Sequence, residues 1–309
     1  MPSIQVRPFH RRDREQLTGL VNAHAAAVVP GVSVSVAAML SHLEREPGEF
    51  IVDPWVAERV TLVAEQNNRV AAAAHLLRYG RGEEIGPAYR GGGEIRWLLF
   101  WPEGPRGTNP WWTAGTQAAT ELVAACIAQF GQWNVTSQGA GGELPVPGVY
   151  GVPEQWPHVR ELYEQAGFVH TGHTEAVYLA RLTDLPRLDS PPLAGLEVSR
   201  TVGLNGTRLS AVLAGEVIGY IEVEIRAEGE RLSRQAGWAD VGNLRVSEEY
   251  RRRKVATWLL SQAASWLELA HVDRLLDYSY SEGRTPDGQA DDEHRAFLNA
   301  LPFTLLTRT

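Results

Sequence analysis

The arrangement of hydrophobic and polar positions between residues 239 and 270 predicts a strand followed by an amphipathic helix. Val241, Leu244 and Val246 stand among small and polar residues, as is typical of a strand. The apolar side chains that follow recur at a spacing of roughly 3.6, which marks one buried helix face, at Val255, Leu259, Ala263, Trp266, Leu267 and Ala270. A short basic turn, Tyr250-Arg251-Arg252-Arg253-Lys254, separates the two elements.

This basic turn opens the predicted helix and therefore has the properties of an anion site. The first amides of a helix have no partner inside it, and the helix dipole makes that end positive. A phosphate or pyrophosphate suits such an end best. Two other interpretations stay open, a solvated turn and a nucleic-acid patch. A net charge of −8 over 309 residues argues against the second, because phosphate-backbone binders usually carry a broad basic face.

The first part of the chain divides into strands and helices that alternate as in one mixed α+β domain. Predicted strands cover residues 4–8, 61–65, 70–77, 94–101, 132–136 and 176–182, and predicted helices cover residues 13–28, 35–46, 113–130 and 156–165. Three of the 18 prolines then fall within residues 184–193, which indicates a linker.

The pattern after this linker partly repeats the first part. Predicted strands over residues 196–200, 208–213, 217–225, 274–280 and 303–308 accompany the segment 239–270 and a last helix over residues 291–301. Only about 40 residues separate Leu196 from Gly237, too few for a strand, two helices and a hairpin. The second half is therefore predicted to be a shortened repeat that lacks the first two helices.

The segment NLRVSEEYRRRKVATWLL resembles the central motif of the GCN5-related N-acetyltransferase (GNAT) family. In that family an Arg/Gln-x-x-Gly-x-Gly/Ala turn holds the pyrophosphate of acetyl-CoA; here the turn reads Arg251-x-x-Lys254-x-Ala256. The segment VRELYEQAGFVHTGHTEAVYLARL resembles the family's helix-Tyr-x-x-x-Gly-Phe-strand signature. The resemblance implies an α+β fold of two GNAT-like domains of the tandem-repeat type, each a mixed, mainly antiparallel sheet flanked by helices.

The resemblance also implies a division of the chain and a co-substrate. Residues 1–183 form an N-terminal GNAT-like domain with a degenerate CoA turn, residues 184–195 a linker, and residues 196–309 a shortened C-terminal domain with the CoA pyrophosphate turn. Acetyl-CoA, or another acyl-CoA, is the implied co-substrate of the second copy, with no metal. The implied cofactor-binding residues are Leu244, Arg245, Val246, Arg251, Arg252, Arg253, Lys254, Val255, Ala256 and Thr257.

Catalytic residues of the second copy are carried over in the same way. The family commonly uses a carboxylate on the strand before the turn as a base and a Tyr on a later helix as an acid. Asp240, six residues before Val246, matches the base position, with a solvent-facing or capping Asp as the alternative. Leu298 stands at the Tyr position, so Tyr280, or Tyr278 beside it, is the candidate acid, with ordinary strand aromatics as the alternative.

The first copy keeps the catalytic positions but has a poor phosphate turn. Glu94 and Tyr163 match the base and acid positions and are catalytic candidates if this copy is active. Its turn, residues 102–112, contains three prolines and one Arg, and proline donates no N–H to an anion. Trp156 and His158 are candidates for the wall of an acceptor cleft, with loop packing as the alternative.

Composition narrows the remaining possibilities. The single cysteine, Cys126, excludes an intramolecular disulfide, and no apolar run reaches transmembrane length. The start, MPSIQVRPFHRR, lacks the apolar core of a signal peptide. We expect a cytoplasmic monomer or homodimer without a membrane or nucleic-acid partner. The predicted function is acyl-CoA-dependent N-acyl transfer to a small amine acceptor by direct attack in a ternary complex. The alternative is a non-catalytic acetyltransferase-like CoA-binding or structural module.

Overall fold

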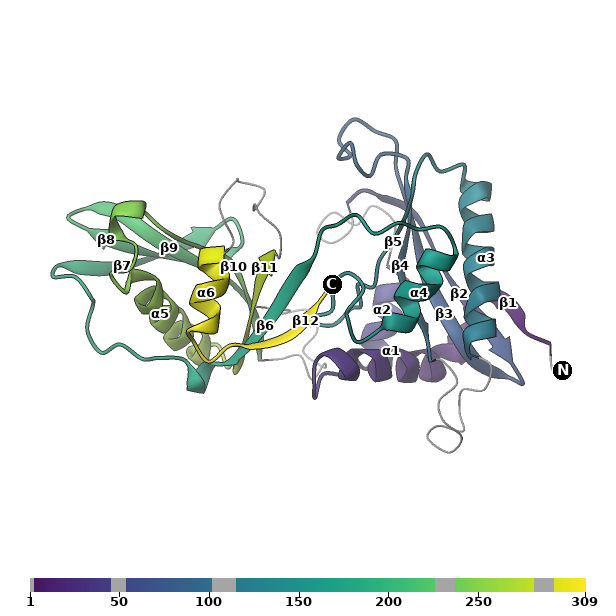
Figure 1. Ribbon diagram of the computed structural model, residues 1–309, viewed down its shortest axis with the longest axis horizontal. Helices are drawn as coiled ribbons and strands as arrows, with labels where there is room; N and C mark the ends of the chain where they lie inside the picture. The colour runs from purple at the N-terminus through teal and green to yellow at the C-terminus, as the bar shows by residue number, and fades with distance from the viewer. Residues whose placement is uncertain (1–2, 46–53, 102–114, 226–236, 281–291) are drawn as a thin grey trace. The chain divides into compact units, whose positions relative to one another are not determined.

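The computed structural model describes residues 3–45, 54–101, 115–225, 237–280 and 292–309, and it divides into two compact units (Figure 1). The first unit comprises residues 1–172 together with Thr309, and the second comprises residues 173–308. Each unit is built on one β-sheet, with five strands in the first and seven in the second. The predicted α+β class with two sheets is confirmed.

The first sheet has the strand order β1-β2-β3-β4-β5, and only β4 and β5 run parallel. Its strands are β1 (Gln5–Pro8), β2 (Val56–Gln66), β3 (Arg69–Tyr79), β4 (Gly93–Phe100) and β5 (Gln138–Ala140). Asn67 and Asn68 connect β2 to β3 with φ angles of 54° and 61°, a conformation that asparagine adopts more readily than most residues. The strands predicted over residues 61–65 and 70–77 thus form an antiparallel hairpin.

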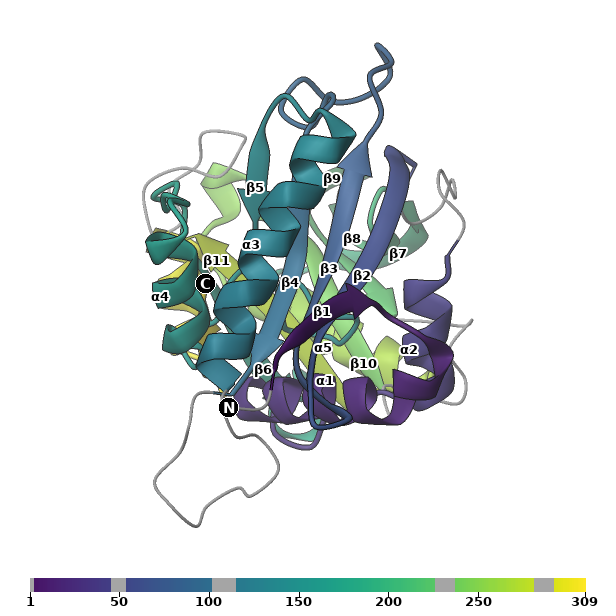
Figure 2. The same cartoon turned by 90° about the vertical axis from the view of Figure 1, so that its right-hand side faces the viewer.

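Helices cover the first sheet and bury its central strand. They are α1 (Arg14–Val28), α2 (Val36–Leu43), α3 (Gly115–Trp133) and α4 (Pro157–Gln165). α3 packs along β2, β3 and β4 (Figure 2), and α1 also contacts β3 and β4. From Val70 to Leu77 every side chain of β3 is buried, on both faces of the strand. A strand with two buried faces reads as a continuous apolar run, as this one does.

The strand predicted over residues 132–136 is wrong. α3 continues through Trp133, and Asn134, with a φ of 49°, ends it in a left-handed conformation. Phe130 is fully buried and continues the apolar stripe of the helix into its last turn. A short apolar run at the end of a helix is too short to show either the helical or the strand period, so the sequence pattern alone does not distinguish a helix from a strand there.

The second sheet has the strand order β12-β6-β11-β10-β9-β8-β7, with β10 and β11 as its one parallel pair. Its strands are β6 (Glu175–Arg181), β7 (Leu196–Gly203), β8 (Gly206–Leu213), β9 (Glu216–Ile225), β10 (Trp238–Val246), β11 (Arg274–Tyr280) and β12 (Thr304–Arg308). The helices of this unit are α5 (Val255–Leu269) and α6 (Asp292–Asn299). α5 packs on β8, β9 and β10 and buries the face of the sheet that carries Ile221, Val223 and Ala239.

The predicted loss of two helices in the second half is confirmed. β7 leads directly into β8 through a tight turn, and Gly203 pairs with Gly206 across it. β8 and β9 then form a second hairpin around Ala214 and Gly215, both with positive φ. The whole of this stretch, residues 196–225, is described and contains no helix.

β6 pairs with strands of the second unit, although the sequence placed residues 176–182 at the end of the first domain. It lies between β11 and β12 and runs antiparallel to both. Ala176, Tyr178 and Ala180 belong to the core under α5, and Val177, on the opposite face of the strand, is also fully buried. The alternation of apolar and polar residues along a strand indicates which side chains are buried, but it does not indicate which sheet the strand joins.

The proline-rich segment predicted as a linker packs against α5. Leu185 is buried in the second core, and Leu188 and Leu193 pack against it. The Leu188 amide donates to Ser261 Oγ at 3.1 Å, and the Arg187 guanidinium donates to Ser265 Oγ at 3.2 Å. The segment is thus part of the second unit, whose first residue is His173.

Candidate functional site

The two parallel strands of the second sheet separate part-way along their length. Trp238, Ala239 and Asp240 pair with residues 274–276 of β11, and beyond them β10 pairs only with β9 and β11 only with β6. A bulge between Val241 and Asn243 begins at the same place. Gly242 occupies it, because a Cβ there would lie 2.4 Å from the Cβ of Asn205. Past this point the two strands no longer pair with each other.

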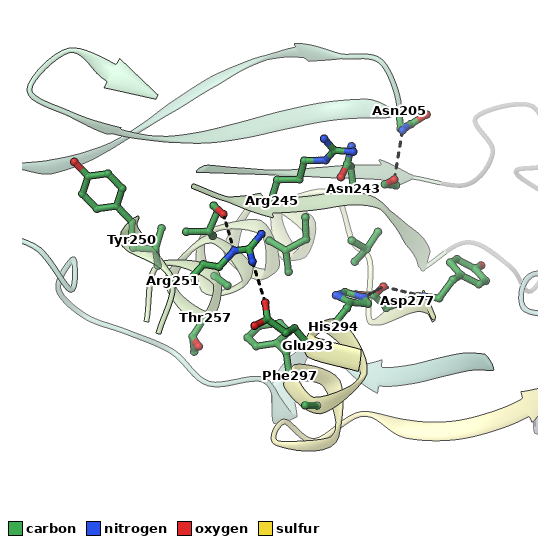
Figure 3. Close-up of a pocket in the computed structure, with 18 of the residues that line it drawn as sticks. Asn205, Asn243, Arg245, Tyr250, Arg251, Thr257, Asp277, Glu293, His294 and Phe297 are labelled. Atoms are coloured by element: carbon green, nitrogen blue, oxygen red, sulfur yellow. Dashed lines mark hydrogen bonds and ion pairs between the residues drawn. The ribbon is translucent and has the colours of Figure 1, made fainter. Parts of the chain in front are cut away.

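A cavity of about 1140 Å³ opens at this separation (Figure 3). β10, β11, the basic turn, the first turn of α5, and α6 all contribute to its wall. All the predicted cofactor-binding residues line it except Arg253. Arg253 is not part of this wall; its guanidinium lies over the ring of Tyr250, 5.8 Å from the ring centre.

The start of α5 forms one end of the cavity. Lys254 is the N-cap residue and makes no side-chain capping bond, and the helix bonding begins with the Trp258 amide, which donates to the Lys254 carbonyl at 3.0 Å. The amides of Val255, Ala256 and Thr257 precede that bond, so they have no acceptor inside the helix. All three residues line the cavity. This end has the geometry of an anion site.

The backbone of the turn shows why a family glycine is expected there. Lys254 has a φ of 63° and Arg252 a φ of 60°, both in the left-handed region. Glycine adopts this region without strain, whereas a residue with a Cβ pays roughly 1–2 kcal/mol for it. Lys254 therefore keeps the conformation of the family glycine and adds an ammonium group at the mouth of the anion site.

Arg251 forms an ion pair with a carboxylate at this end of the cavity. Its Nε donates to the Val246 carbonyl at 3.3 Å, and its Nη1 donates to Glu293 Oε2 at 3.1 Å (Figure 3). Arg252 lies 3.8 Å from the other oxygen of Glu293. The carboxylate of Glu293 thus occupies the place where a phosphate bound to this turn would accept the same hydrogen bonds.

Asp240 and the tyrosines lie further along the same cavity. Asp240 is only 5% exposed, and the Tyr278 hydroxyl donates to its Oδ1 at 3.0 Å. The alternative of a solvent-facing Asp is therefore wrong. Tyr280 also lines the cavity and is 42% exposed. Leu298, at the family's Tyr position, is fully buried in the core and does not line the cavity.

Two residues that the sequence analysis did not select form a second polar pair in this cavity. His294 Nε2 donates to Asp277 Oδ1 at 2.9 Å, and the Tyr278 amide donates to the same oxygen at 2.8 Å. Asp277 is buried on β11, and His294 lies on α6, one helical turn before Leu298. The spacing of His294 from the family's Tyr position is the one signal in the sequence that points to it.

The catalytic candidates of the first unit do not line this cavity and are tied to neighbouring groups. The Tyr79 hydroxyl donates to Glu94 Oε2, and Arg96 lies 3.5 Å from Glu94 Oε1. The Tyr163 hydroxyl donates to the Gly141 carbonyl at 3.0 Å. Burial, with the Glu94 charge as a smaller cause, raises the pKa of Tyr163 well above its usual value. The phosphate turn of this copy, residues 102–112, lies outside the described residues.

Aromatic side chains fill the space at the end of β4 in the first unit. The His24 ring stacks on Trp101 with 4.6 Å between ring centres and meets the edge of Trp156 at 5.2 Å. The His158 ring lies 4.9 Å from Phe100. Trp156 is fully buried, and its indole N–H donates to the His24 carbonyl at 3.2 Å. For Trp156 the alternative of loop packing, rather than a cleft wall, is the one observed.

Two other features are absent from the described ranges, a metal-binding cluster and a membrane-spanning helix. These ranges contain no group of three His, Cys, Asp or Glu side chains placed to hold a metal ion. Among the helices of those ranges, none combines the length and the apolar character that crossing a bilayer requires.

The splayed strands and the anion end fall within the part of the chain that a family model matches, whereas α6, which completes the cavity wall, lies beyond it. Residues 176–281 match the model of the acetyltransferase (GNAT) family. This part of the chain is a GNAT domain. The match begins in β6, so the strand that follows the first unit is included in the matched GNAT segment. No curated protein sequence matches the chain.

Solved GNAT structures share the fold over nearly the whole length of the chain. A tandem GNAT protein from the clavulanic acid biosynthesis pathway, solved without acetyl-CoA, is 16% identical, with a TM-score of 0.61 over 99% of this chain and 96% of its own. A GNAT protein from Sphaerobacter thermophilus is 15% identical, with a TM-score of 0.54 over 99% of this chain and 93% of its own. At these identities the likeness shows the fold of a tandem GNAT protein.

A third match is to one region of a larger solved enzyme. The glucosamine N-acetyltransferase region of a fungal multi-domain GH3 β-N-acetylglucosaminidase is 11% identical, with a TM-score of 0.60. The match covers all of this chain but only 38% of that protein. It adds a further example of the same fold.

Proposed function

We propose that the second unit binds an acyl-CoA, with acetyl-CoA as the first choice, and transfers the acyl group to a small amine. The observation that carries this proposal is that the start of α5 and the separated edges of β10 and β11 open into one cavity. An anion site alone fits many phosphates, and separated strands alone fit many ligands. Together they fit a molecule with a diphosphate at one end and a long amide-bearing arm.

The residues at the anion end fit the diphosphate. Amides of the first turn of α5 donate to it, and Arg251, Arg252 and Lys254 neutralise its charge. Beyond Val241, β10 no longer pairs with β11, so the arm is proposed to lie along this side of β10 and to pair with its backbone as a neighbouring strand would. From Val246 back to Asp240 this edge is about 20 Å long. The arm therefore leads from the anion end to the Asp240–Tyr278 pair.

The chemistry proposed at that point is direct attack in a ternary complex. The amine nitrogen attacks the thioester carbonyl carbon, the carbon–sulfur bond breaks, and the products are an amide and the free thiol. Asp240 is proposed as the base that removes a proton from the amine, directly or through water. Tyr280 stays the acid candidate from the sequence. A cytoplasmic location, with monomer or homodimer as its state of assembly, belongs to the same proposal.

The alternative is a CoA-binding or structural module without catalysis. Leu298 favours it, because a buried leucine replaces the family's acid. The Arg251–Glu293 ion pair also favours it, since a phosphate must displace Glu293 to reach Arg251.

Calorimetry with acetyl-CoA, followed by turnover on a panel of small amines with detection of the free thiol, tests the proposal. We expect binding and release of thiol that depends on the amine. Absence of binding at millimolar acetyl-CoA refutes the proposal, and binding without turnover over the panel favours the module.

A further inference from the structure

We infer that His294, held by Asp277, is the general acid that protonates the leaving thiolate in the second unit. The inference rests on the proposed acyl transfer and names a catalytic residue for it. Acyl transfer from a thioester releases a thiolate, and a positioned acid accelerates its departure. The residue that matches the family's acid position is Leu298, whose side chain is fully buried and has no proton to give.

His294 is placed on the same helix face as Leu298, one turn earlier, and lines the cavity. Its ring is oriented by the 2.9 Å hydrogen bond from Nε2 to Asp277. Asp277 is 3% exposed and also accepts the Tyr278 amide at 2.8 Å, so the carboxylate itself is fixed. A buried carboxylate beside an imidazole favours the protonated ring, which is the form that donates a proton.

The contacts along the cavity connect His294 both to the anion end and to the strand that carries the partner of the candidate base. Arg251, at the anion end, bonds Glu293, the residue directly before His294. On the other side, Asp277 directly precedes Tyr278, whose hydroxyl bonds Asp240. A thioester whose diphosphate sits on α5 and whose acyl carbon faces Asp240 carries its sulfur between these two points.

The proposed step balances in protons. Asp240 takes one proton from the attacking amine, and the protonated His294 gives one to the sulfur as the carbon–sulfur bond breaks. Exchange with solvent then returns both groups to their starting states. Nε2 is occupied by Asp277, so Nδ1 is the nitrogen that donates. An imidazole suits this task better than Tyr280, because its ordinary pKa lies near neutral pH whereas that of a phenol lies near 10.

The test uses the full chain and three variants, His294→Gln, Asp277→Asn and Tyr280→Phe. The glutamine amide still donates a hydrogen bond to Asp277, but it has no proton that it can transfer to the sulfur. We therefore expect kcat to fall by about 10²-fold. We expect the dissociation constant for acetyl-CoA, measured by calorimetry, to change less than twofold. Wild-type kcat should fall at high pH as the ring loses its proton, and this fall should be absent in His294→Gln.

Asp277→Asn, which keeps the shape of the side chain, should shift that high-pH fall toward lower pH, because the ring loses its negative neighbour. Tyr280→Phe removes the acid candidate named from the sequence, and the high-pH fall should remain in this variant because His294 still donates its proton. Arg295→Ala, on α6 but outside the cavity wall, controls for damage to the helix.

The results separate the two proposals. If the wild type binds acetyl-CoA and turns over an amine while His294→Gln keeps the wild-type kcat and pH profile, the role of His294 is refuted and acyl transfer stands. If Tyr280→Phe rather than His294→Gln removes the high-pH fall, the acid is Tyr280. If the wild type does not bind acetyl-CoA at all, acyl transfer is refuted, and the role of His294 with it.

Discussion

His24 in the first unit should make the stability of the protein depend on pH between about 6.5 and 4. Its side chain is fully buried, and burial lowers its pKa from 6.5 to about 4, with the neighbouring His158 as a smaller cause in the same direction. A histidine whose pKa is lower in the folded state stabilises the fold fully above its unfolded pKa. That stability is lost as the pH falls toward the folded pKa, because the unfolded chain binds the proton first.

The magnitude follows from the size of the shift. One pKa unit corresponds to about 1.4 kcal/mol, so a shift from 6.5 to about 4 amounts to about 3 kcal/mol. Replacement by glutamine removes the titration and leaves a polar side chain of similar reach. We expect the wild type to lose about 3 kcal/mol more free energy of unfolding than His24→Gln between pH 7.5 and pH 4.

Urea unfolding of both proteins at several pH values, followed by tryptophan fluorescence, measures this difference. Trp101 and Trp156 contact the His24 ring, so the emission reports on this region. Other buried histidines such as His75, whose pKa is also lowered by burial, titrate in both proteins and cancel in the difference.

The opposite sign would refute the reasoning. His24 Nδ1 lies 2.8 Å from the Leu20 carbonyl and Nε2 lies 3.0 Å from the Phe100 carbonyl. A neutral ring donates to only one of them, whereas a protonated ring donates to both. If the wild type gains stability relative to His24→Gln as the pH falls, these two hydrogen bonds outweigh burial and the ring is charged in the fold.

Four further predictions concern the second unit. Arg251→Ala should weaken acetyl-CoA binding about tenfold or more, because a charged hydrogen bond contributes roughly 1.5–3 kcal/mol. The control variant Arg253→Ala should change the dissociation constant less than twofold, and equal effects of the two variants in calorimetry would contradict the anion site. Glu293→Ala should tighten the same binding by at most about fivefold, since an exposed ion pair of about 0.2–1 kcal/mol no longer competes, and weaker binding would contradict this. Lys254→Gly should stabilise the fold by up to about 1 kcal/mol by removing left-handed strain, a lower melting midpoint being the contrary result. Asp240→Asn should reduce kcat about 10²-fold with little effect on acetyl-CoA affinity, and an unchanged kcat would remove Asp240 as the base.

The segment from β10 to α5 could be predicted because its signals are local. The apolar period, the basic turn and the short distance between strand and helix all lie within one stretch of sequence, and together they define the anion end. The loss of two helices was also predictable, since the length of chain between Leu196 and Gly237 excludes them. Chain length and local period are properties that a single sequence states directly.

Features that depend on pairing between distant segments could not be predicted in this way. The Asp277–His294 pair joins a strand to a helix, and nothing in either segment states that they face each other. Arg253 has the same character as its neighbours in the sequence, and only the left-handed backbone on both sides of it turns it toward Tyr250. The partner strands of β6 are likewise a property of the folded sheets.

The position of β6 limits how this gene can be divided. A fragment that begins after the proline-rich segment encodes β11 and β12 but not the strand that joins them. In such a fragment, the edge of β11 that pairs with β6 in the full chain, including the backbone of Asp277 and Tyr278, would be exposed. An exposed strand edge of this kind can pair with the same edge of another copy of the fragment. Recombination that exchanges the second half of this protein for another must therefore cut before residue 173, or the inherited half arrives without the strand that lies between β11 and β12.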